Sequence, residues 1–474
     1  MFLSELIGDR PGGADTRITG FAIDSRKVAP GTVFGAFRGT QVNGEDYIPN
    51  AVAAGAVAVF ARPEALVTGA VHIADAEPRR AFAQAAAKFF APFPDTVVAV
   101  TGTNGKTSTV ELTRQLWRMA GYHAASIGTL GVTTADDSVS TGLTTPDVAT
   151  FLSNMAGLRR EGVTHAAFEA SSHGLAQFRT EGLPVQAGAF TNLSRDHLDY
   201  HGTMEAYLEA KLRLFSEVIE PDGAAVVWMD DPASTRVAEI ARERGLKLIT
   251  LGTKGETFRL VERTPTQLGQ TLKIEAAGTI HTVKLPLIGA YQAANSLTAA
   301  GLVHATGGEI GDIFALLGRV QPVRGRLERA AISRAGAPIY VDYAHTPDGL
   351  EAAIQALRPH TAGRLIVMFG AGGDRDRGKR PLMGTVAASL ADQVIVTDDN
   401  PRSEDPAFIR REVMAGAPEA TEIGGRRDAI AAAIQQAGAN DIVLLAGKGH
   451  EQGQIVGDRI LPFDDVQVAR ECAG

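Results

Sequence analysis

The sequence contains almost no cysteine and no long apolar run. Its single cysteine, Cys472, excludes an internal disulfide framework and fits a reducing compartment. Apolar stretches such as AVAAGAVAVFA at 51–61 are too short to span a bilayer, and the first residues lack a basic region followed by a long apolar segment. We therefore predict a cytoplasmic protein that is not inserted into a membrane.

The sequence also lacks an excess of basic residues. It has 46 Lys and Arg against 54 Asp and Glu, a net charge of −8, and no basic run interleaved with aromatic residues. Nucleic-acid-binding surfaces need such a basic patch, so we predict no nucleic-acid partner. Because the chain has 474 residues, 45% of them hydrophobic, it can bury several cores, and its length suggests about three domains.

Two changes along the chain suggest domain boundaries. Pro92 and Pro94 discourage regular structure in APFPD, after which short β-rich runs alternate with helical periods. The alternation is interrupted near VQPVRGRLE, at 320–328, and restarts with IYVDYAHTP. Such alternation predicts an α/β fold with mostly parallel sheets. We expect three domains, with the bounds 1–95, 96–323 and 324–474.

A glycine-rich segment, TGTNGKTST at 101–109, lies between the apolar run VVAV and a helical pattern. Gly102 and Gly105 let backbone N–H groups approach an anion, and Lys106 adds a cation at the helix N-terminus. Thr107 can place its hydroxyl on Mg2+. Only two residues separate Gly102 from Gly105, so the loop is shorter than the common phosphate loop. A simple glycine-rich turn is the alternative, but strand, helix and Gly-Lys-Thr together favour a nucleotide phosphate.

Three further residues carry little weight by themselves. Glu169 and His197 follow two successive apolar strands, and ligands of open α/β sheets bind beyond the carboxyl ends of strands. A carboxylate and a neutral imidazole can bind Mg2+, although a lone histidine is better explained as a hydrogen-bonded structural residue. Lys211 lies in the helical pattern MEAYLEAKLRLFSEV, where the residues alone indicate a solvated lysine.

The order of the motifs resembles that of the Mur ligase family over almost the whole chain. Besides TGTNGKTST and the segments around Glu169, His197 and Lys211, the matching stretches are GAYQAANSLTAA, RGRLE, VDYAHTPDGL, GGDRDRGKRPLM, DNPR and GKGHE. Each motif alone is a moderate indication, whereas the ordered set is a strong one.

The resemblance implies a UDP-sugar-binding domain, a central phosphate-loop ATPase and a C-terminal Rossmann-like domain for an amino acid. It implies a ligase of peptidoglycan synthesis that uses ATP and Mg2+, and we expect this ligase to be a monomer. The expected reaction joins meso-diaminopimelate to UDP-N-acetylmuramoyl-L-alanyl-D-glutamate, the UDP-N-acetylmuramoyl dipeptide, through an acyl phosphate. No nucleophilic protein residue is required for it.

The resemblance also assigns the residues around ATP. The phosphates are expected to contact Gly102, Thr103, Asn104, Gly105, Lys106, Thr107, Ser108, Arg326, Asp342 and His345, and the base to contact Asn295. The implied magnesium ligands are Thr107, Glu169, His197 and a carbamylated Lys211. The implied catalytic residues are Lys106, Lys211, His197 and Arg326. Gln292 stands where the family has asparagine, so no base contact is assigned to it.

Two further groups of residues match the family's substrate positions. The acceptor is expected to contact Ile23, Ser25, Thr40, Gln41, Val42, Thr144, Thr145, Ser171, Gln177 and Arg179. The amino acid is expected to contact Asp399, Asn400, Pro401 and Arg402, with Arg375, Gly447 and Glu451. A guanidinium beyond a strand end suits a carboxylate, which favours meso-diaminopimelate over lysine, and Glu451 can pair with an ammonium group.

Two other functions remain open. A folylpolyglutamate-synthetase-like ligase shares the short loop and the acyl phosphate, but it has no counterpart of the N-terminal domain or of DNPR. A phosphate-loop ATP hydrolase, acting as a switch or motor with a C-terminal binding module, is the alternative from another class. A ligase needs both acceptor and amino acid to release phosphate, whereas a switch does not.

Overall fold

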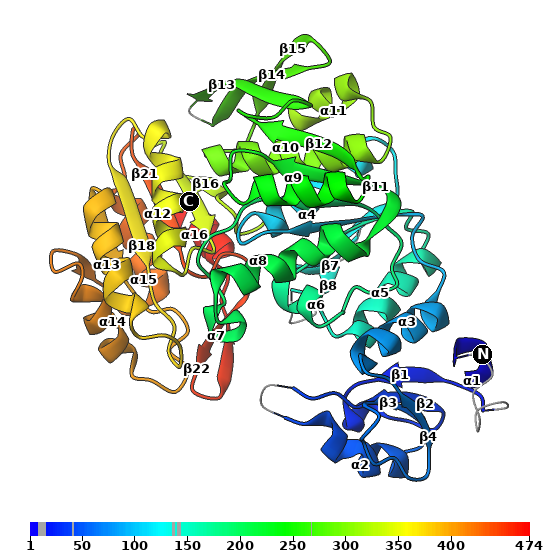
Figure 1. Ribbon diagram of the computed structural model, residues 1–474. Helices are drawn as coiled ribbons and strands as arrows, with labels where there is room; N and C mark the ends of the chain where they lie inside the picture. The colour runs from blue at the N-terminus through cyan, green and yellow to red at the C-terminus, as the bar shows by residue number, and fades with distance from the viewer. Residues whose placement is uncertain (8–15, 40–41, 135–137, 140–143, 267) are drawn as a thin grey trace. The chain divides into compact units, whose positions relative to one another are not determined.

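The computed structural model describes residues 1–7, 16–39, 42–134, 138–139, 144–266 and 268–474 (Figure 1). The chain divides into two compact units, residues 1–259 with 297–313 and residues 260–296 with 314–474. Thr40 and Gln41, which we expect to bind the acceptor, lie outside the described residues. No helix in the described ranges is both long and apolar enough to cross a bilayer.

The first unit begins with a small four-stranded sheet. Its strands are all parallel and lie in the order β1 (Gly20–Ala22), β2 (Thr32–Gly35), β3 (Ala56–Ala61) and β4 (Val71–Ala74). The helices of this part are α1 (Leu3–Ile7), α2 (Ile48–Ala53) and α3 (Pro78–Phe90). Phe82 of α3 packs edge-on against Phe21, Phe37 and Phe60, so four aromatic rings share one core beneath this sheet.

The larger sheet of the first unit runs in the order β12-β11-β10-β5-β9-β6-β7-β8. Its strands are β5 (Thr96–Thr101), β6 (Ala124–Gly128), β7 (Gly131–Thr133), β8 (Ser138–Val139), β9 (His165–Glu169), β10 (Val185–Phe190), β11 (Ile219–Trp228) and β12 (Lys247–Gly252). All neighbours pair in parallel except β7 and β8 at one edge. Residues 97–100 of β5 are completely buried, as an apolar strand covered on both faces requires.

Helices connect these strands, as βαβ units require. They are α4 (Lys106–Met119), α5 (Val148–Arg160), α6 (Ser172–Ala176), α7 (Leu198–His201), α8 (Met204–Arg213) and α9 (Ser234–Glu243). A π-helical turn at Leu214–Val218 follows α8. The predicted α/β fold with mostly parallel sheets is confirmed here.

The second unit contains a six-stranded sheet in the order β16-β17-β21-β18-β19-β20. The strands are β16 (Glu328–Ile332), β17 (Pro338–Asp342), β18 (Leu365–Phe369), β19 (Gln393–Val396), β20 (Thr421–Glu422) and β21 (Ile442–Ala446), of which only β16 pairs antiparallel. Alternate residues of its strands enter two separate cores. One core takes residues of α12 (Pro347–Leu357), α13 (Lys379–Leu390) and α14 (Pro406–Met414), and the other takes residues of α15 (Arg426–Gln436) and α16 (Asp465–Ala473).

Some of the remaining elements extend across the division of the units, and the others are hairpins that the sequence did not predict. β13 (Phe258–Thr266) pairs through its first residues with β12, and β14 (Gly269–Ala276) forms an antiparallel pair with β15 (Thr279–Leu285). They are followed by α10 (Ala290–Ala305) and α11 (Ile310–Leu317). A second hairpin, β22 (Gly453–Val456) and β23 (Arg459–Pro462), follows β21.

Candidate active site

The sequence-predicted loops of the first unit meet at one edge of the larger sheet. β10, β5 and β9 are parallel neighbours, so the loops that follow them leave from the same edge. The loop at 102–105 follows β5, Glu169 ends β9, and the segment from Thr191 follows β10. Ligands of α/β sheets bind at this edge, as expected.

The phosphate loop depends on its glycines. Gly102 and Gly105 have φ values of 143° and 85°, in the range that side chains avoid. A Cβ on Gly102 would lie 1.9 Å from Thr191 Oγ1, so no other residue fits. Lys106 Nζ donates to the carbonyls of Gly102 and Thr103, at 3.0 and 2.7 Å. These two hydrogen bonds hold the lysine side chain against the loop that precedes it.

A segment after β10 holds the loop from the other side. Asn192 O accepts the N–H of Thr103 at 2.8 Å, and Asn192 Oδ1 accepts the N–H of Asn104 at 3.0 Å. The N–H of Ser194 donates to Thr103 Oγ1 at 3.0 Å. These bonds fix the loop before any ligand binds, which lowers the ordering cost of binding.

Lys211 lies in α8 with its side chain buried against the loop. It is 1% exposed, so it is not a solvated helix lysine. Nζ donates to Gly102 O at 2.7 Å and lies 4.1 Å from the centroid of the Tyr207 ring. Burial, and then the neighbouring Lys106, hold the pKa of Lys211 well below its ordinary value. The geometry therefore favours a neutral amine at this point.

Tyr207 continues the same buried group. Its hydroxyl donates to Thr103 Oγ1 at 3.2 Å, and burial raises the pKa of the phenol to about 12. The phenol therefore stays protonated and keeps the loop and α8 connected.

Glu169 is buried at the end of β9 and its carboxylate is already bound. Oε1 accepts the N–H of Thr129 at 2.7 Å and Oε2 accepts the Thr129 hydroxyl at 3.3 Å. A Cβ on Gly128 would lie 2.1 Å from Oε1, so this glycine leaves room for the carboxylate.

His197 is the least enclosed of the expected magnesium ligands. It has a left-handed backbone with φ of 52°, and its side chain is 48% exposed. Its ring lies 4.9 Å from that of His173 and 6.1 Å from that of Tyr207, and Nε2 is 3.5 Å from Asp196. In the described part of the chain no three His, Cys, Asp or Glu residues form a metal-binding group. A magnesium site here would therefore need other ligands besides these residue types, such as the hydroxyl of Thr107.

The expected acceptor residues before α5 and after β9 form one hydrogen-bonded group. Thr145 Oγ1 donates to Glu169 O at 2.8 Å and contacts Ser171 Oγ at 3.0 Å. Arg179 donates to Thr145 O at 2.5 Å and to Gln177 Oε1 at 2.8 Å. Thr144 joins through its hydroxyl, 3.1 Å from that of Thr129. The group therefore connects Glu169 to the acceptor positions.

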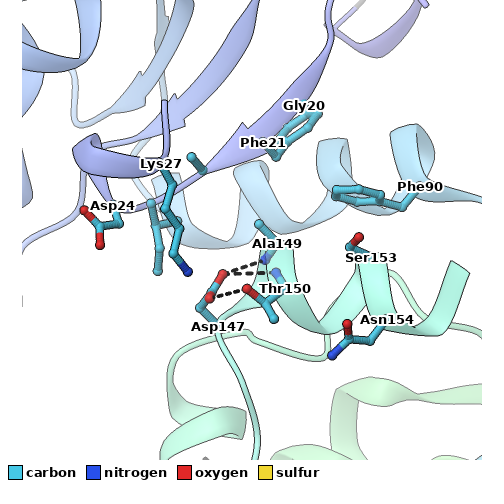
Figure 2. A pocket seen from close by; sticks show the side chains of 12 residues that line it. Gly20, Phe21, Asp24, Lys27, Phe90, Asp147, Ala149, Thr150, Ser153 and Asn154 are labelled. Carbon is cyan, nitrogen blue, oxygen red and sulfur yellow. Dashed lines mark hydrogen bonds between the residues drawn. The ribbon is translucent and has the colours of Figure 1, made fainter. Parts of the chain in front are cut away.

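Ile23 lines a cavity of about 280 Å³ between the N-terminal sheet and α5 (Figure 2). Its walls include Phe21, Lys27, Phe90, Asp147, Thr150, Ser153 and Asn154. Asp147 caps α5, because Oδ1 accepts the N–H groups of Ala149 and Thr150 at 3.1 Å each. The cavity thus combines aromatic faces with hydroxyl, amide and charged groups. Ser25 begins the short helix beside it, and Val42 is 54% exposed.

In the second unit, the three expected phosphate residues lie close together. Asp342 ends β17, and its carboxylate accepts the N–H groups of Leu327 and Ala344 at 2.7 and 2.9 Å. The guanidinium carbon of Arg326 is 4.8 Å from the centroid of the Tyr343 ring, and the His345 ring lies 4.5 Å from the same ring. Burial raises the pKa of Asp342, opposed by Arg326.

Gln292 and Asn295 point to each other within this unit. Asn295 Nδ2 donates to Gln292 Oε1 at 3.3 Å, and Gln292 Nε2 donates to Arg326 O at 3.0 Å. Both are buried. Gln292 therefore braces the loop that carries Arg326.

Asp399, Asn400, Pro401 and Arg402 follow β19. Arg402 has φ of 53°, and its backbone pairs with β22, donating to Ile455 O at 3.0 Å and accepting the N–H of Gly457 at 2.7 Å. Its Nη1 donates to Gly373 O at 2.7 Å. The hairpin therefore holds the arginine in a conformation that side chains rarely adopt.

The other expected amino-acid contacts surround this turn. A Cβ on Gly447 would lie 2.8 Å from Asp399 Oδ2, so the glycine permits the close approach of the turns that follow β21 and β19. Glu451 Oε2 accepts Asn400 Nδ2 at 2.8 Å. Arg375 is exposed and donates to Asp374 O at 3.1 Å.

Comparisons with known proteins agree along the whole chain. The models described as "Mur ligase family, catalytic domain", "Mur ligase middle domain" and "Mur ligase, glutamate ligase domain" match residues 17–97, 100–303 and 325–449. A UDP-N-acetylmuramoyl-L-alanyl-D-glutamate--2,6-diaminopimelate ligase from Zymomonas mobilis subsp. mobilis is 62% identical, over 99% of this chain and 98% of that one. The chain belongs to the Mur ligase family. The ligase of the same name from Bradyrhizobium diazoefficiens is 50% identical, over 98% of this chain and 97% of its own.

Solved structures of Mur ligases share the fold. One titled as the same diaminopimelate ligase has a TM-score of 0.76 at 32% identity, over 100% of this chain and 98% of its own. A MurF ligase from Thermotoga maritima, solved in complex with ADP, has a TM-score of 0.61 at 20% identity, over 97% of both chains. Folylpolyglutamate synthase from Mycobacterium tuberculosis, also with ADP, has a TM-score of 0.64 at 19% identity, over 84% of this chain and 94% of its own. At these identities the last two show the fold alone.

Several residues at the centre of this Mur ligase were not singled out from the sequence. They are Tyr207, Asn192, Ser194 and Lys448. No local pattern distinguishes them, because their contacts lie in other segments. The buried Lys448 in GKGHE gave the one available signal, since it lies inside a matched motif.

Proposed function

We infer that this Mur ligase joins meso-2,6-diaminopimelate to UDP-N-acetylmuramoyl-L-alanyl-D-glutamate at the expense of ATP, in peptidoglycan synthesis. The 62% identity to a ligase of that name over the full length carries this conclusion. The full-length relatives do not favour a folylpolyglutamate-synthetase-like ligase or a hydrolytic switch. We also propose that the protein is cytoplasmic, because ATP and UDP-linked precursors are cytoplasmic substrates, and that it is a monomer.

We assign the amino-acid substrate to the turn after β19. Arg402 offers a fork of N–H donors to the distal carboxylate, and Arg375 adds positive charge on the same side of the sheet. Glu451 pairs with the distal ammonium. Lysine has no distal carboxylate, so its binding would leave Arg402 unpaired at a cost of about 1–3 kcal/mol.

We assign ATP to the phosphate loop. Gly102, Gly105 and the first turn of α4 present backbone N–H groups, and Lys106 supplies a cation. The ADP in the T. maritima ligase structure supports nucleotide binding by this fold. From the second unit we assign Arg326, Asp342 and His345 to the phosphates and Asn295 to the base.

We propose that magnesium is held by Thr107, Glu169, His197 and a carbamylated Lys211. The low pKa of Lys211 supports this, because a neutral amine adds to CO2, forming an N–C bond and releasing a proton. The carbamate replaces an uncompensated buried amine with oxygen ligands. Bound magnesium would neutralise phosphate charge as the D-glutamyl carboxylate displaces ADP from the γ-phosphate.

We propose that the acceptor extends from the cavity at Ile23 to the group around Thr145. Ser25 and Val42 lie on the side of the N-terminal sheet, and Ser171, Gln177 and Arg179 suit peptide carboxylates. The matched family models support our three-domain division, because its bounds at 95 and 323 fall close to the gaps between those models.

An ADP-release assay tests the function. The protein is given ATP, Mg2+ and the UDP-muramoyl dipeptide, with meso-diaminopimelate, with L-lysine or with no amino acid. With meso-diaminopimelate we expect one ADP for each amide product, and with L-lysine or no amino acid we expect little reaction. Mass spectrometry then identifies the product. Equal ADP release without dipeptide and amino acid would contradict a ligase, and equal use of lysine would contradict the assigned substrate.

A further inference from the structure

Lys448 is a buried cation to which the proposed reaction gives no role. It follows β21 in the turn Gly447-Lys448-Gly449, whose glycines have φ values of 110° and 55°. Its side chain is 0% exposed. An ammonium group without water must be compensated by protein groups, so the residues that it touches explain why it is there.

Lys448, Asn400 and Glu451 form a closed network. Lys448 Nζ donates to Asn400 Oδ1 and to Glu451 Oε2, both at 3.0 Å. Asn400 Nδ2 donates to the same Glu451 oxygen at 2.8 Å, and Asn400 Oδ1 also accepts the N–H of Ile455 at 2.9 Å. A flipped amide would place its NH2 group against two donors, so only one orientation of Asn400 is compatible with this network.

Glu451 is held through one oxygen only. Oε2 accepts both Lys448 and Asn400, whereas Oε1 accepts no hydrogen bond from the described residues. The side chain of Glu451 is 33% exposed, so the carboxylate has a fixed plane and access from outside. A cationic donor is the ligand that forms the strongest hydrogen bond to such an oxygen.

We infer that Lys448 is a positioning residue that sets the selectivity for the distal ammonium of the amino-acid substrate. The inference rests on the proposed function, in which Arg402 and Glu451 bind the distal carboxylate and ammonium. Lys448 fixes the planes of Asn400 and Glu451 before the substrate arrives. Binding then requires no ordering of the carboxylate, and an amino acid without the distal amine gains nothing from it.

The test compares two amino acids that differ at the distal amine. One is meso-diaminopimelate and the other is L-2-aminopimelate, which keeps the distal carboxylate. Lys448→Met keeps most of the side-chain volume and removes the ammonium. We expect kcat/KM for meso-diaminopimelate to fall by about tenfold or more, mainly through KM, and that for aminopimelate by less than about threefold. The KM values for ATP and the UDP-dipeptide should not change.

Glu451→Gln should reduce the preference for meso-diaminopimelate in the same way. The double variant Lys448→Met/Glu451→Gln should lose no more of that preference than either single variant, because both changes act through one carboxylate. Lys448→Arg, which keeps charge and donors, should retain more of the preference than Lys448→Gln. These two variants also carry the test if Lys448→Met does not fold.

Asp441→Asn is a matched structural control. Asp441 is buried at the opposite end of β21, where it accepts the N–H groups of Arg364 and Gly438 at 2.7 and 2.9 Å. It should lower thermal stability without changing the ratio of the two kcat/KM values. Equal losses for both amino acids in Lys448→Met, or additive losses in the double variant, would overturn this inference alone. A wild-type protein that forms no amide with meso-diaminopimelate would overturn the proposed function as well.

Discussion

The two units each contain a completely buried lysine, and the surroundings of the two lysines differ. Lys211 meets the carbonyl of Gly102 and the ring of Tyr207, with Lys106 nearby. Lys448 meets the amide oxygen of Asn400 and the carboxylate of Glu451. In the described part of the chain the first lysine forms no ion pair, whereas the second forms one at 3.0 Å.

The difference distinguishes a lysine whose amine can react from a lysine that positions neighbouring side chains. Burial, and then the charge of Lys106, lower the pKa of Lys211 against the opposing effect of Asp196, which favours a nucleophilic amine. A carboxylate and an amide around Lys448 satisfy its charge and hold neighbouring side chains in place. Burial alone therefore does not indicate the role of a lysine, which depends on the groups that its amine contacts.

The largest expected effect is that of Lys211→Met on ligation. Without an amine no carbamate forms, so the magnesium ion that would neutralise the phosphate charge loses one of its protein ligands. We therefore expect kcat to fall by about a thousandfold or more. Short carboxylic acids should restore part of the activity of Lys211→Ala, which leaves room for them, and none of that of Lys448→Met. A steady-state assay with and without added acid measures both, and near-normal turnover of folded Lys211→Met would break the comparison.

Lys106→Ala should reduce kcat by about a hundredfold to a thousandfold. The change removes a cation from the phosphate loop rather than a core side chain, so circular dichroism should show an intact fold. No carboxylic acid should rescue this variant, which separates its role from that of Lys211. Turnover close to that of the wild type would refute the assignment of ATP to this loop.

Arg402→Ala should raise the KM for meso-diaminopimelate by about tenfold to a hundredfold, corresponding to about 1–3 kcal/mol. The KM values for ATP and the UDP-dipeptide should stay close to those of the wild type. Unaltered diaminopimelate kinetics would show that this arginine does not select the substrate.

The smallest expected effect concerns stability. Because the folded-state pKa of Lys211 lies below the ordinary 10.5, the unfolded chain binds more protons in the window between the two values. Stability should therefore rise with pH through this window and level off above about 10.5. In ligand-free protein, Lys211→Met should raise the melting temperature at neutral pH and remove this rise. Lys448→Met should instead lower the melting temperature, so melting curves of both variants across the window compare the two sites.

The sequence predicts the α/β fold because apolar strands covered on both faces give continuous hydrophobic runs, as in VVAV. It also predicts the loops after β5 and β19, because glycine, proline and charged residues follow those runs. The burial of Lys211 could not be predicted from its helical pattern, because a loop 109 residues away covers it. The bond between Asn104 and Asn192 likewise joins residues 88 apart. Tertiary contacts of this kind leave no local periodicity.

The most direct test of the comparison is the detection of a lysine carbamate with 13C-labelled CO2. NMR spectra are recorded for the wild type, Lys211→Met and Lys448→Met, in the presence of Mg2+ and ATP analogue. We predict one slowly exchanging carbamate signal in the wild type, its loss in Lys211→Met and its retention in Lys448→Met. A wild type without the signal, or a folded Lys211→Met that keeps it, would contradict the distinction between the two buried lysines.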